Sequence, residues 1–151
     1  MTDNADALPQ LKLTNQICHA LYSATNALIR AYRPLLEPLD LTYPQYLVML
    51  SLWEEDGVPI RNLVHHTRLD SGTLTPILKR LEQKGLLIRG RAATDERSKT
   101  ITLTVAGLAL KQQAADVPAA LVCQTDMTAD QALELKALAE TLYQQLQKGP
   151  R

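Results

Sequence analysis

The chain has 151 residues, 46% of them apolar, which suits one globular domain, and no apolar run is long enough to cross a bilayer. Residues 1–10 lack the basic start and the apolar stretch of a signal peptide, so we expect a cytoplasmic protein. The formal net charge is zero, but residues 61–99 hold nine basic and four acidic residues, whereas the remainder holds seven basic and twelve acidic ones. This segregation indicates a local positive surface that can meet nucleic acid.

Two helices are predicted in the first third of the chain. Apolar residues recur at spacings of three or four over about residues 11–36, and Pro34 and Pro38 are expected to end or bend this helix. The run Thr42–Gln45 matches a capping box, in which the first and last residues cap each other's main chain. It opens a second helix, predicted over about residues 45–55.

A tight turn joins two shorter helices, predicted over about residues 59–67 and 73–84. The second has apolar residues at i, i+3, i+4 and i+7 counted from Leu74, which defines one buried face. Its opposite face starts with small hydroxyls, which can reach phosphates or base edges, and continues with cations that suit backbone phosphates. The residues that we assign to DNA contacts here are Ser71, Thr73, Thr75, Lys79 and Arg80.

The pattern then changes to a period of two, which predicts strands over residues 87–91 and 100–104 with a polar, protruding loop over residues 92–99. Two short helices followed by a charged hairpin form a winged helix-turn-helix. Arg97 lies near the predicted tip, where an arginine can enter a minor groove. The other basic wing residues are Arg89, Arg91 and Lys99, and we assign the two arginines to DNA contacts as well.

The helical pattern returns after the hairpin. One helix is predicted over residues 105–122 with a kink at Pro118, and a last one follows the capping-box pattern Thr128–Gln131 and runs to about Gln147. The predicted fold is therefore mainly α with a small β-hairpin wing.

Several motifs resemble the MarR family of transcription regulators. Leu69–Glu82 is similar to the recognition helix of that family, and Asp95 and Arg97 form an Asp-x-Arg pattern similar to that of its wing. Ile17–Tyr22 and Leu41–Tyr46 resemble the organic-hydroperoxide-sensing branch, known as OhrR. The resemblance covers nearly the whole chain. It implies a homodimeric repressor that binds inverted-repeat operator DNA, with the aspartate of the wing pattern among the DNA-binding residues.

The resemblance also implies that different segments of the chain bind DNA and form the dimer. We expect a single winged-helix domain over residues 1–151. Its core over about residues 45–104 is expected to bind DNA, and the helices over about residues 8–38 and 105–148 are expected to form the dimer.

Four residues match the redox site of this branch. Cys18 matches the cysteine that organic hydroperoxides oxidise, and Cys123 matches the resolving cysteine of the two-cysteine type, which forms an intersubunit disulfide. Tyr32 and Tyr43 match tyrosines that hydrogen-bond the sensor sulfur from the partner subunit. Tyr32 lies fourteen residues after Cys18, about 21 Å along a straight helix, so the two cannot touch within one chain unless the helix breaks, whereas a dimer with crossing first helices could bring them together. Hydroxyl donors stabilise a thiolate and make the sulfur a better nucleophile.

The residues alone leave other functions open. A repressor of this fold can instead be released by a small aromatic ligand at the dimer interface, with Cys18 incidental, and the fold also serves as a protein-binding adaptor. A thiol peroxidase is a further alternative, although the chain has neither a βαβ pattern nor a Cys-x-x-Cys motif. The alternatives for Cys123 are a buried apolar side chain and capping of Cys18 by a small external thiol. No metal or cofactor is expected, because His19, His65 and His66 lack companions at metal-ligand spacing.

Overall fold

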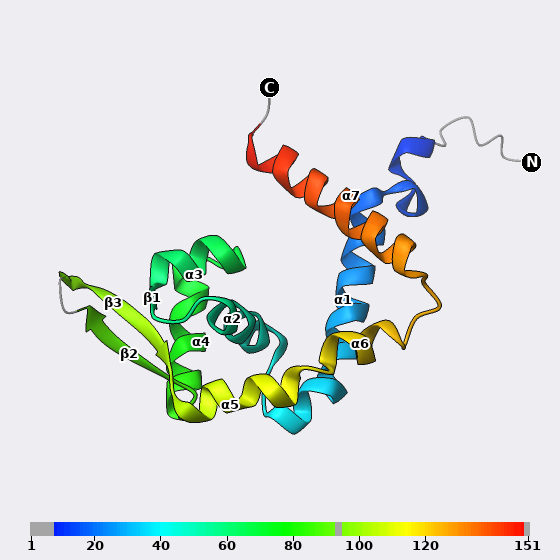
Figure 1. Cartoon of the computed structure of the whole chain (residues 1–151). Helices are drawn as coiled ribbons and strands as arrows, with labels where there is room; N and C mark the ends of the chain where they lie inside the picture. The colour runs from blue at the N-terminus through cyan, green and yellow to red at the C-terminus, as the bar shows by residue number, and fades with distance from the viewer. Residues whose placement is uncertain (1–7, 93–94, 150–151) are drawn as a thin grey trace, which may run out of the picture. The chain divides into compact units, whose positions relative to one another are not determined.

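The computed structural model describes the backbone of residues 8–92 and 95–149, and the side chains of the same residues except 91–98. The chain divides into two compact units, Met1–Val117 and Pro118–Arg151 (Figure 1). The first unit combines helices with a small antiparallel sheet. None of the helices within the described residues is long and apolar enough to cross a membrane.

The first long helix, α1, spans Ile17–Leu36 and is preceded by two short 3-10 turns. The predicted start near residue 11 is therefore wrong. The reason is local, because the side-chain amides of Asn15 and Gln16 donate to main-chain oxygens up to six residues earlier and hold the chain in turns. At the other end α1 continues two residues beyond Pro34 before a further 3-10 turn, Glu37–Leu39.

Helices α2 (Tyr43–Glu54) and α3 (Ile60–Thr67) follow. The predicted capping box is confirmed at the start of α2. Thr42 Oγ1 accepts from the N–H of Gln45 at 3.4 Å, and Gln45 Oε1 accepts from the N–H of Thr42 at 3.1 Å. Two N–H groups at the start of α2 that have no partner within the helix are therefore bonded by the capping side chains.

Helix α4 spans Ser71–Gln83, and it begins two residues before the predicted start. Asp70 causes the earlier start, since its carboxylate accepts from the N–H of Thr73 at 2.6 Å as the N-cap. The turn between α3 and α4 passes through Arg68 in the left-handed region, with φ of 63°. The buried face predicted for this helix is confirmed, and its fully buried residues are Leu74, Leu78 and Leu81.

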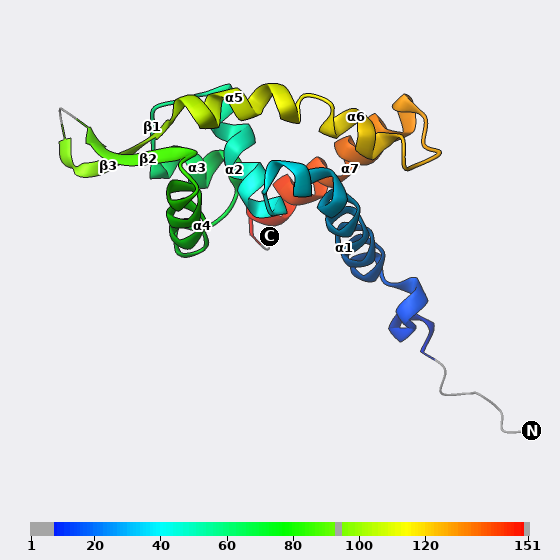
Figure 2. The same ribbon diagram turned by 90° about the horizontal axis from the view of Figure 1, so that it is seen from below.

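Three antiparallel strands form the sheet, in the order β1 (Val58–Pro59), β3 (Asp95–Leu103), β2 (Leu87–Ala92). Val58 pairs with Ile101, which is completely buried. Figures 1 and 2 show the β2–β3 hairpin projecting away from α2, α3 and α4. The base of the hairpin thus belongs to the core, and its far part forms a wing.

The strands differ from the prediction in two respects. Strand β1 was not predicted, because its two residues form a strand only by pairing with β3. The predicted loop over residues 92–99 is wrong, because β2 continues to Ala92 and β3 already begins at Asp95. Alternating apolar residues indicate only the part of a strand that has one buried face. In a projecting hairpin the two strands continue to pair through their backbones beyond that buried part, so the alternation does not show their full length.

Three helices complete the chain: α5 (Val105–Ala114), α6 (Val117–Val122) and α7 (Ala129–Gln147). The single kinked helix predicted over residues 105–122 is wrong, since α5 ends before α6 begins. Pro118 has no N–H to donate and so cannot continue the hydrogen bonds of α5, whereas in the first turn of α6 that N–H would have no partner within the helix in any case. The capping box at Thr128 is confirmed by both of its hydrogen bonds.

Trp53, near the end of α2, fixes α5 against the core of the first unit. Its Nε1 donates to the main-chain oxygen of Gly107 at 2.9 Å, and Lys111 Nζ donates to the main-chain oxygen of Trp53 at 3.0 Å. A Cβ at Gly107 would lie only 2.0 Å from the main-chain oxygen of Leu86, so glycine permits this close approach. The hairpin and α5 are thereby held against the helices that present α4.

Candidate DNA-binding and cysteine sites

The outward face of α4 carries every DNA contact predicted for this helix. With three leucines fully buried on one side, the polar residues lie on the solvent side, as the spacing requires. The exposed residues of this face are Ser71, Thr73, Thr75, Lys79 and Arg80. A helix with this arrangement can enter a major groove with small hydroxyls first and cations behind them.

The first turn of α4 is held by side-chain hydrogen bonds. The N–H and hydroxyl of Thr73 donate to Asp70, and these bonds lower the pKa of the Asp70 carboxyl. Thr75 Oγ1 donates to the main-chain oxygen of Ser71 at 2.8 Å. The turn that would meet DNA first is therefore fixed before any ligand arrives.

Arg89 of β2 joins the wing to α4. Its Nε donates to Glu82 Oε2 at 2.6 Å, and its main-chain N–H donates to Glu82 Oε1 at 3.3 Å. These hydrogen bonds lower the pKa of Glu82. The contact shows that Arg89 orients the hairpin, and its assignment to DNA stays a prediction.

The other predicted wing contacts are only partly described. Arg91 lies in β2, and Asp95 and Arg97 lie in β3, but their side chains fall outside the described part. Lys99 is exposed. The backbone thus places the three assigned residues in the projecting part of the hairpin.

Tyr32, Tyr43 and Tyr46 form an aromatic group, the tyrosine cluster, where the end of α1 meets the start of α2. The ring centroids of Tyr32 and Tyr43 are 5.0 Å apart, and those of Tyr32 and Tyr46 are 5.7 Å apart. Burial raises the pKa of all three hydroxyls, and the neighbouring tyrosines raise that of Tyr32 further. Tyr46 was not predicted as a site residue, although it stands three residues after Tyr43 and so shares a face of α2.

Cys18 lies far from the tyrosine cluster within one chain. It is the second residue of α1, and its thiol is free and exposed. Tyr32 lies fourteen residues further along the same uninterrupted helix, a distance of about 21 Å. The structure thus brings the two predicted tyrosines together and leaves the cysteine at the opposite end of α1.

Cys123 is also free and exposed. It follows α6 directly in a turn, and its N–H donates to the main-chain oxygen of Ala119 at 3.0 Å. The alternative that it is a buried apolar residue does not hold within the chain. Both thiols are accessible to an oxidant.

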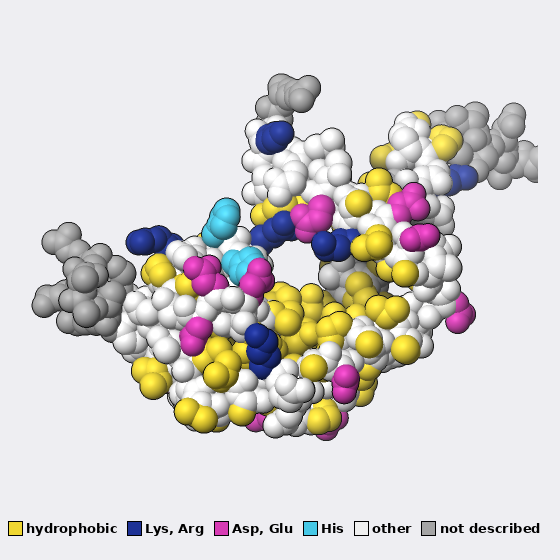
Figure 3. All heavy atoms as spheres, in the orientation of Figure 1, with side chains coloured by type: hydrophobic (Ala, Val, Ile, Leu, Met, Phe, Trp, Pro, Cys, Tyr) yellow, Lys and Arg dark blue, Asp and Glu magenta, His cyan; other side chains and the backbone are white. Residues whose placement is uncertain are grey.

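Helices α1 and α7 bury few of their apolar side chains within the chain. Leu36 is the buried residue of α1, and α7 has none. Figure 3 shows hydrophobic side chains at the surface of the face in view. The large apolar residues that these two helices expose are Ile17, Tyr22, Leu28, Leu133, Leu135, Leu138 and Leu146. Such faces are typical of helices that pack against another chain.

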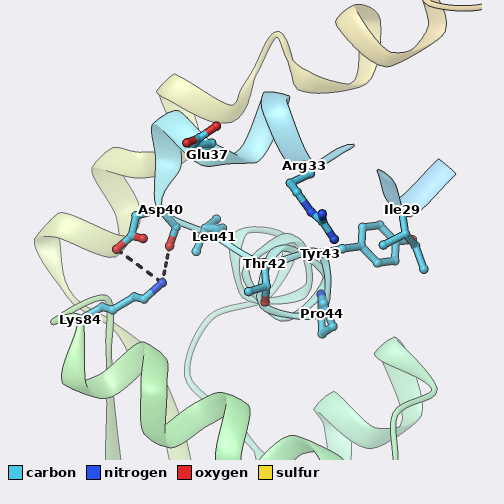
Figure 4. Close-up of a pocket in the computed structure, with 9 residues that line it drawn as sticks. All are labelled: Ile29, Arg33, Glu37, Asp40, Leu41, Thr42, Tyr43, Pro44 and Lys84. Atoms are coloured by element: carbon cyan, nitrogen blue, oxygen red, sulfur yellow. Dashed lines mark hydrogen bonds and ion pairs between the residues drawn. The ribbon is translucent and has the colours of Figure 1, made fainter. Parts of the chain in front are cut away.

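A hollow of 570 Å³ lies beside Tyr43, at the junction of α1 and α2. Figure 4 shows Arg33 reaching toward Tyr43 on one side and Lys84 beside Asp40 on the other. Two cations and two acids line it together with apolar residues, so its charges balance. The lining residues are Ile29, Arg33, Glu37, Asp40, Leu41, Thr42, Tyr43, Pro44 and Lys84.

One histidine connects α2 and α3. His66 Nδ1 lies 2.7 Å from Ser51 Oγ, and His66 Nε2 lies 3.3 Å from Glu54 Oε2. No three of the described His, Cys, Asp and Glu side chains are grouped so that they could hold a metal ion.

Comparison with known proteins points to transcription regulators. The family model described as transcriptional regulator SarA/Rot matches residues 30–114. An organic hydroperoxide resistance transcriptional regulator of Bacillus subtilis is 43% identical over 138 residues, which cover 89% of this chain and 94% of the relative.

Solved structures of AbfR from Staphylococcus epidermidis are similar over nearly the whole chain. Reduced AbfR bound to DNA has a TM-score of 0.79 and 37% identity, and the match covers 93% of this chain and 96% of AbfR. Disulfide-formed AbfR has a TM-score of 0.65 and 36% identity, with 91% and 95% covered.

Proposed function

Because the chain belongs to the MarR/SarA-type winged-helix regulators of transcription, we propose that it is a dimeric repressor that leaves operator DNA when an organic hydroperoxide oxidises Cys18. The observation that carries this proposal is the position of Cys18 at one end of α1 and of the tyrosine cluster at the other. A second copy is then needed to bring hydroxyl donors to the sulfur. The exposed apolar faces of α1 and α7 supply surfaces on which that copy can pack.

In the proposed complex a two-fold dimer spans an inverted repeat, with α4 of each subunit in a major groove and Arg97 at each wing tip in a minor groove. The core over about residues 45–104 makes these contacts, and the helices over about residues 8–38 and 105–148 form the dimer, within one winged-helix domain. The exposed hydroxyls and cations of α4 support the first part. The excess of basic residues over residues 61–99 supports the electrostatic part.

The proposed chemistry begins with the Cys18 thiolate, which attacks the terminal oxygen of the hydroperoxide. The O–O bond breaks, the sulfur becomes a sulfenic acid, and the alkoxide leaves and takes up a proton as the alcohol. Tyr32 and Tyr43 of the partner donate hydrogen bonds to the thiolate before the attack. The thiol of the partner's Cys123 then displaces the hydroxyl group, which leaves as water, and a disulfide forms between the subunits.

A disulfide places strict demands on the dimer. The two sulfurs must approach to about 2.05 Å and the Cα atoms to within about 7 Å. Reduced thiols that lie further apart must move together, and we propose that this movement takes the two copies of α4 out of the spacing that adjacent grooves require. Both thiols are exposed within the chain, which supports this step.

Fluorescence anisotropy on a labelled inverted-repeat DNA tests the proposal. Reduced wild type should bind, leave the DNA after treatment with an organic hydroperoxide such as cumene hydroperoxide, and return with dithiothreitol. Cys18→Ser should bind as tightly and ignore the oxidant, because a serine hydroxyl forms no sulfenic acid. Release of Cys18→Ser as readily as wild type would rule out Cys18 as the sensor.

Cys123→Ser serves as the matched cysteine variant. On a non-reducing gel after oxidation, wild type should run as a covalent dimer and Cys123→Ser as a monomer. A wild type that stays monomeric on the gel while still leaving DNA would instead support capping of Cys18 by a small thiol.

The hollow beside Tyr43 favours one second candidate, a repressor released by a small aromatic ligand. In that case a ligand should release Cys18→Ser and wild type equally. Release by hydroperoxide that depends on Cys18 contradicts this candidate.

A further inference from the structure

Lys84 connects the end of α4 to the segment that carries the tyrosine cluster. It is the C-cap residue of α4, and its ammonium donates to the main-chain oxygen of Asp40 and, over 3.1 Å, to Oε1 of Gln45. The ammonium also lies 3.5 Å from Oδ2 of Asp40. Figure 4 shows both contacts with Asp40 as dashed lines. The ammonium thus makes two hydrogen bonds and one ion pair with the α1–α2 connection and the start of α2.

The acceptors differ in how strongly they fix the lysine. The side chain of Asp40 is 89% exposed, so its ion pair contributes little. Gln45 is only 3% exposed, and its Oε1 also accepts from the N–H of Thr42 in the capping box. One buried amide oxygen is therefore shared between Lys84 and the N-terminal cap of α2.

Gln45 lies between the two members of the tyrosine cluster that α2 contributes. Tyr43 is the first residue of α2 and Tyr46 the fourth, so both belong to the turn that this cap holds. A rearrangement of the cluster that tilts or shifts this turn moves Oε1 of Gln45 as well. Lys84 must then follow or lose its buried acceptor.

On its own side Lys84 lies where α4 passes into the wing. Its N–H donates to the main-chain oxygen of Arg80 at 3.0 Å, and Gly85 follows in the left-handed region with φ of 74°. Glu82, two residues before Lys84, holds Arg89 of the wing at 2.6 Å. A displacement of Lys84 therefore acts on the last turn of α4 and on the base of the hairpin together.

We propose that Lys84 is a positioning residue that couples the state of the tyrosine cluster to the orientation of α4. This inference rests on the proposed function, in which the cluster receives the sensor cysteine of the partner. Apolar contacts between α2 and α4 are non-directional, so they allow one helix to slide against the other. The hydrogen bonds of Lys84 depend on donor–acceptor geometry, so they fix the end of α4 relative to the start of α2. Lys84 itself meets neither oxidant nor sulfur and acts through Gln45.

A double-mutant cycle on the DNA affinity of the reduced protein tests the coupling. The four proteins are wild type, Tyr43→Leu, Lys84→Met and the double variant, each measured by anisotropy on the same inverted-repeat DNA. Tyr43→Leu removes the ring that contacts Tyr32 and should change the affinity of wild type. In the Lys84→Met background, the factor by which Tyr43→Leu changes the DNA affinity should be smaller by at least about fivefold, which is within the usual range of coupling between sites.

Lys111→Met is the matched control, because Lys111 also donates to a main-chain oxygen, that of Trp53, and its loss removes the same charge. The effect of Tyr43→Leu should persist in full in that background. Lys84→Arg keeps a cation with several donors and should restore part of the coupling, which also covers the case in which Lys84→Met fails to fold. Additive effects of Tyr43→Leu and Lys84→Met, or no effect of Tyr43→Leu on affinity, would overturn the proposal.

A second arm of the same experiment compares each protein before and after hydroperoxide. Oxidation should weaken DNA binding of wild type and Lys111→Met by a larger factor than that of Lys84→Met. If wild type ignores the oxidant, the proposed redox function fails, while the cycle on reduced protein still decides whether Lys84 couples the cluster to α4. If wild type responds and the cycle is additive, the coupling proposal alone fails.

Discussion

Replacing Gly107 by alanine adds a methyl group where the backbone of Leu86 leaves no room. The new Cβ would lie 2.0 Å from the main-chain oxygen of Leu86 and 3.0 Å from its carbonyl carbon. Overpacking of this kind costs about 1–3 kcal/mol. Moving α5 to relieve it lengthens the bond from Trp53 Nε1 to the oxygen of Gly107, now 2.9 Å, and an unsatisfied buried donor costs about 1–3 kcal/mol. Alanine has a helix propensity more favourable than that of glycine by about 1 kcal/mol, so the free energy of unfolding should fall by about 1–5 kcal/mol in total.

Urea unfolding at one fixed protein concentration measures this loss, since the stability of the proposed dimer would depend on concentration. Gly90→Ala in β2 is the control, because nothing lies within 4 Å of a Cβ at that position. Its free energy of unfolding should stay within about 0.5 kcal/mol of wild type. A Gly107→Ala protein as stable as wild type would refute the close approach of α5 to Leu86.

Three further predictions concern DNA binding, pH and oxidation. Arg97→Ala should weaken operator binding and flatten its dependence on salt, because one phosphate or groove contact is lost, and unchanged affinity across a salt series would remove Arg97 from the interface. The hydrogen bonds from Thr73 lower the pKa of Asp70 in the folded protein, so its charged form stabilises the fold above the unfolded-state pKa, and that stability is lost as pH falls through the folded-state pKa. The Tm advantage of wild type over Asp70→Ala should therefore shrink on acidification, and a difference independent of pH would contradict the capping role. Tyr32→Phe should slow oxidation of Cys18 by a hydroperoxide, followed as loss of free thiol, and an unchanged rate would exclude the Tyr32 hydroxyl as a donor.

The elements that the sequence predicted well depend on local interactions. The capping boxes at Thr42 and Thr128 use side chains three residues apart, so this spacing alone predicts where the two helices begin. The apolar repeat of α4 likewise reports one face of one helix, and Leu74, Leu78 and Leu81 are buried as it requires. Local chemistry and the final fold agree at these positions.

The features that the sequence did not reveal depend on residues far apart in the chain. Val58 and Pro59 form a strand only through β3, more than forty residues later. Lys84 reaches Asp40 across a separation of 44 residues. Arg89 resembles a DNA-contacting cation in sequence, and only the fold reveals that Glu82 holds it. Pairings of this kind are set by tertiary packing, which periodicity and spacing do not encode.

The proposed contact of Cys18 with the partner's Tyr32 restricts how two copies of α1 can pack. In a two-fold interface, residue i of one copy meets residue j of the other, and j meets i. Two near-antiparallel copies that place residue 18 opposite residue 32 are centred on residue 25, which is the exposed Thr25. The same register places Tyr22 opposite Leu28, and these are two of the large apolar side chains that α1 leaves exposed within the chain. In the proposed dimer, one arrangement of α1 would therefore both bury this apolar face and bring Cys18 to the tyrosine cluster, so that dimer formation and sensing would use the same interface.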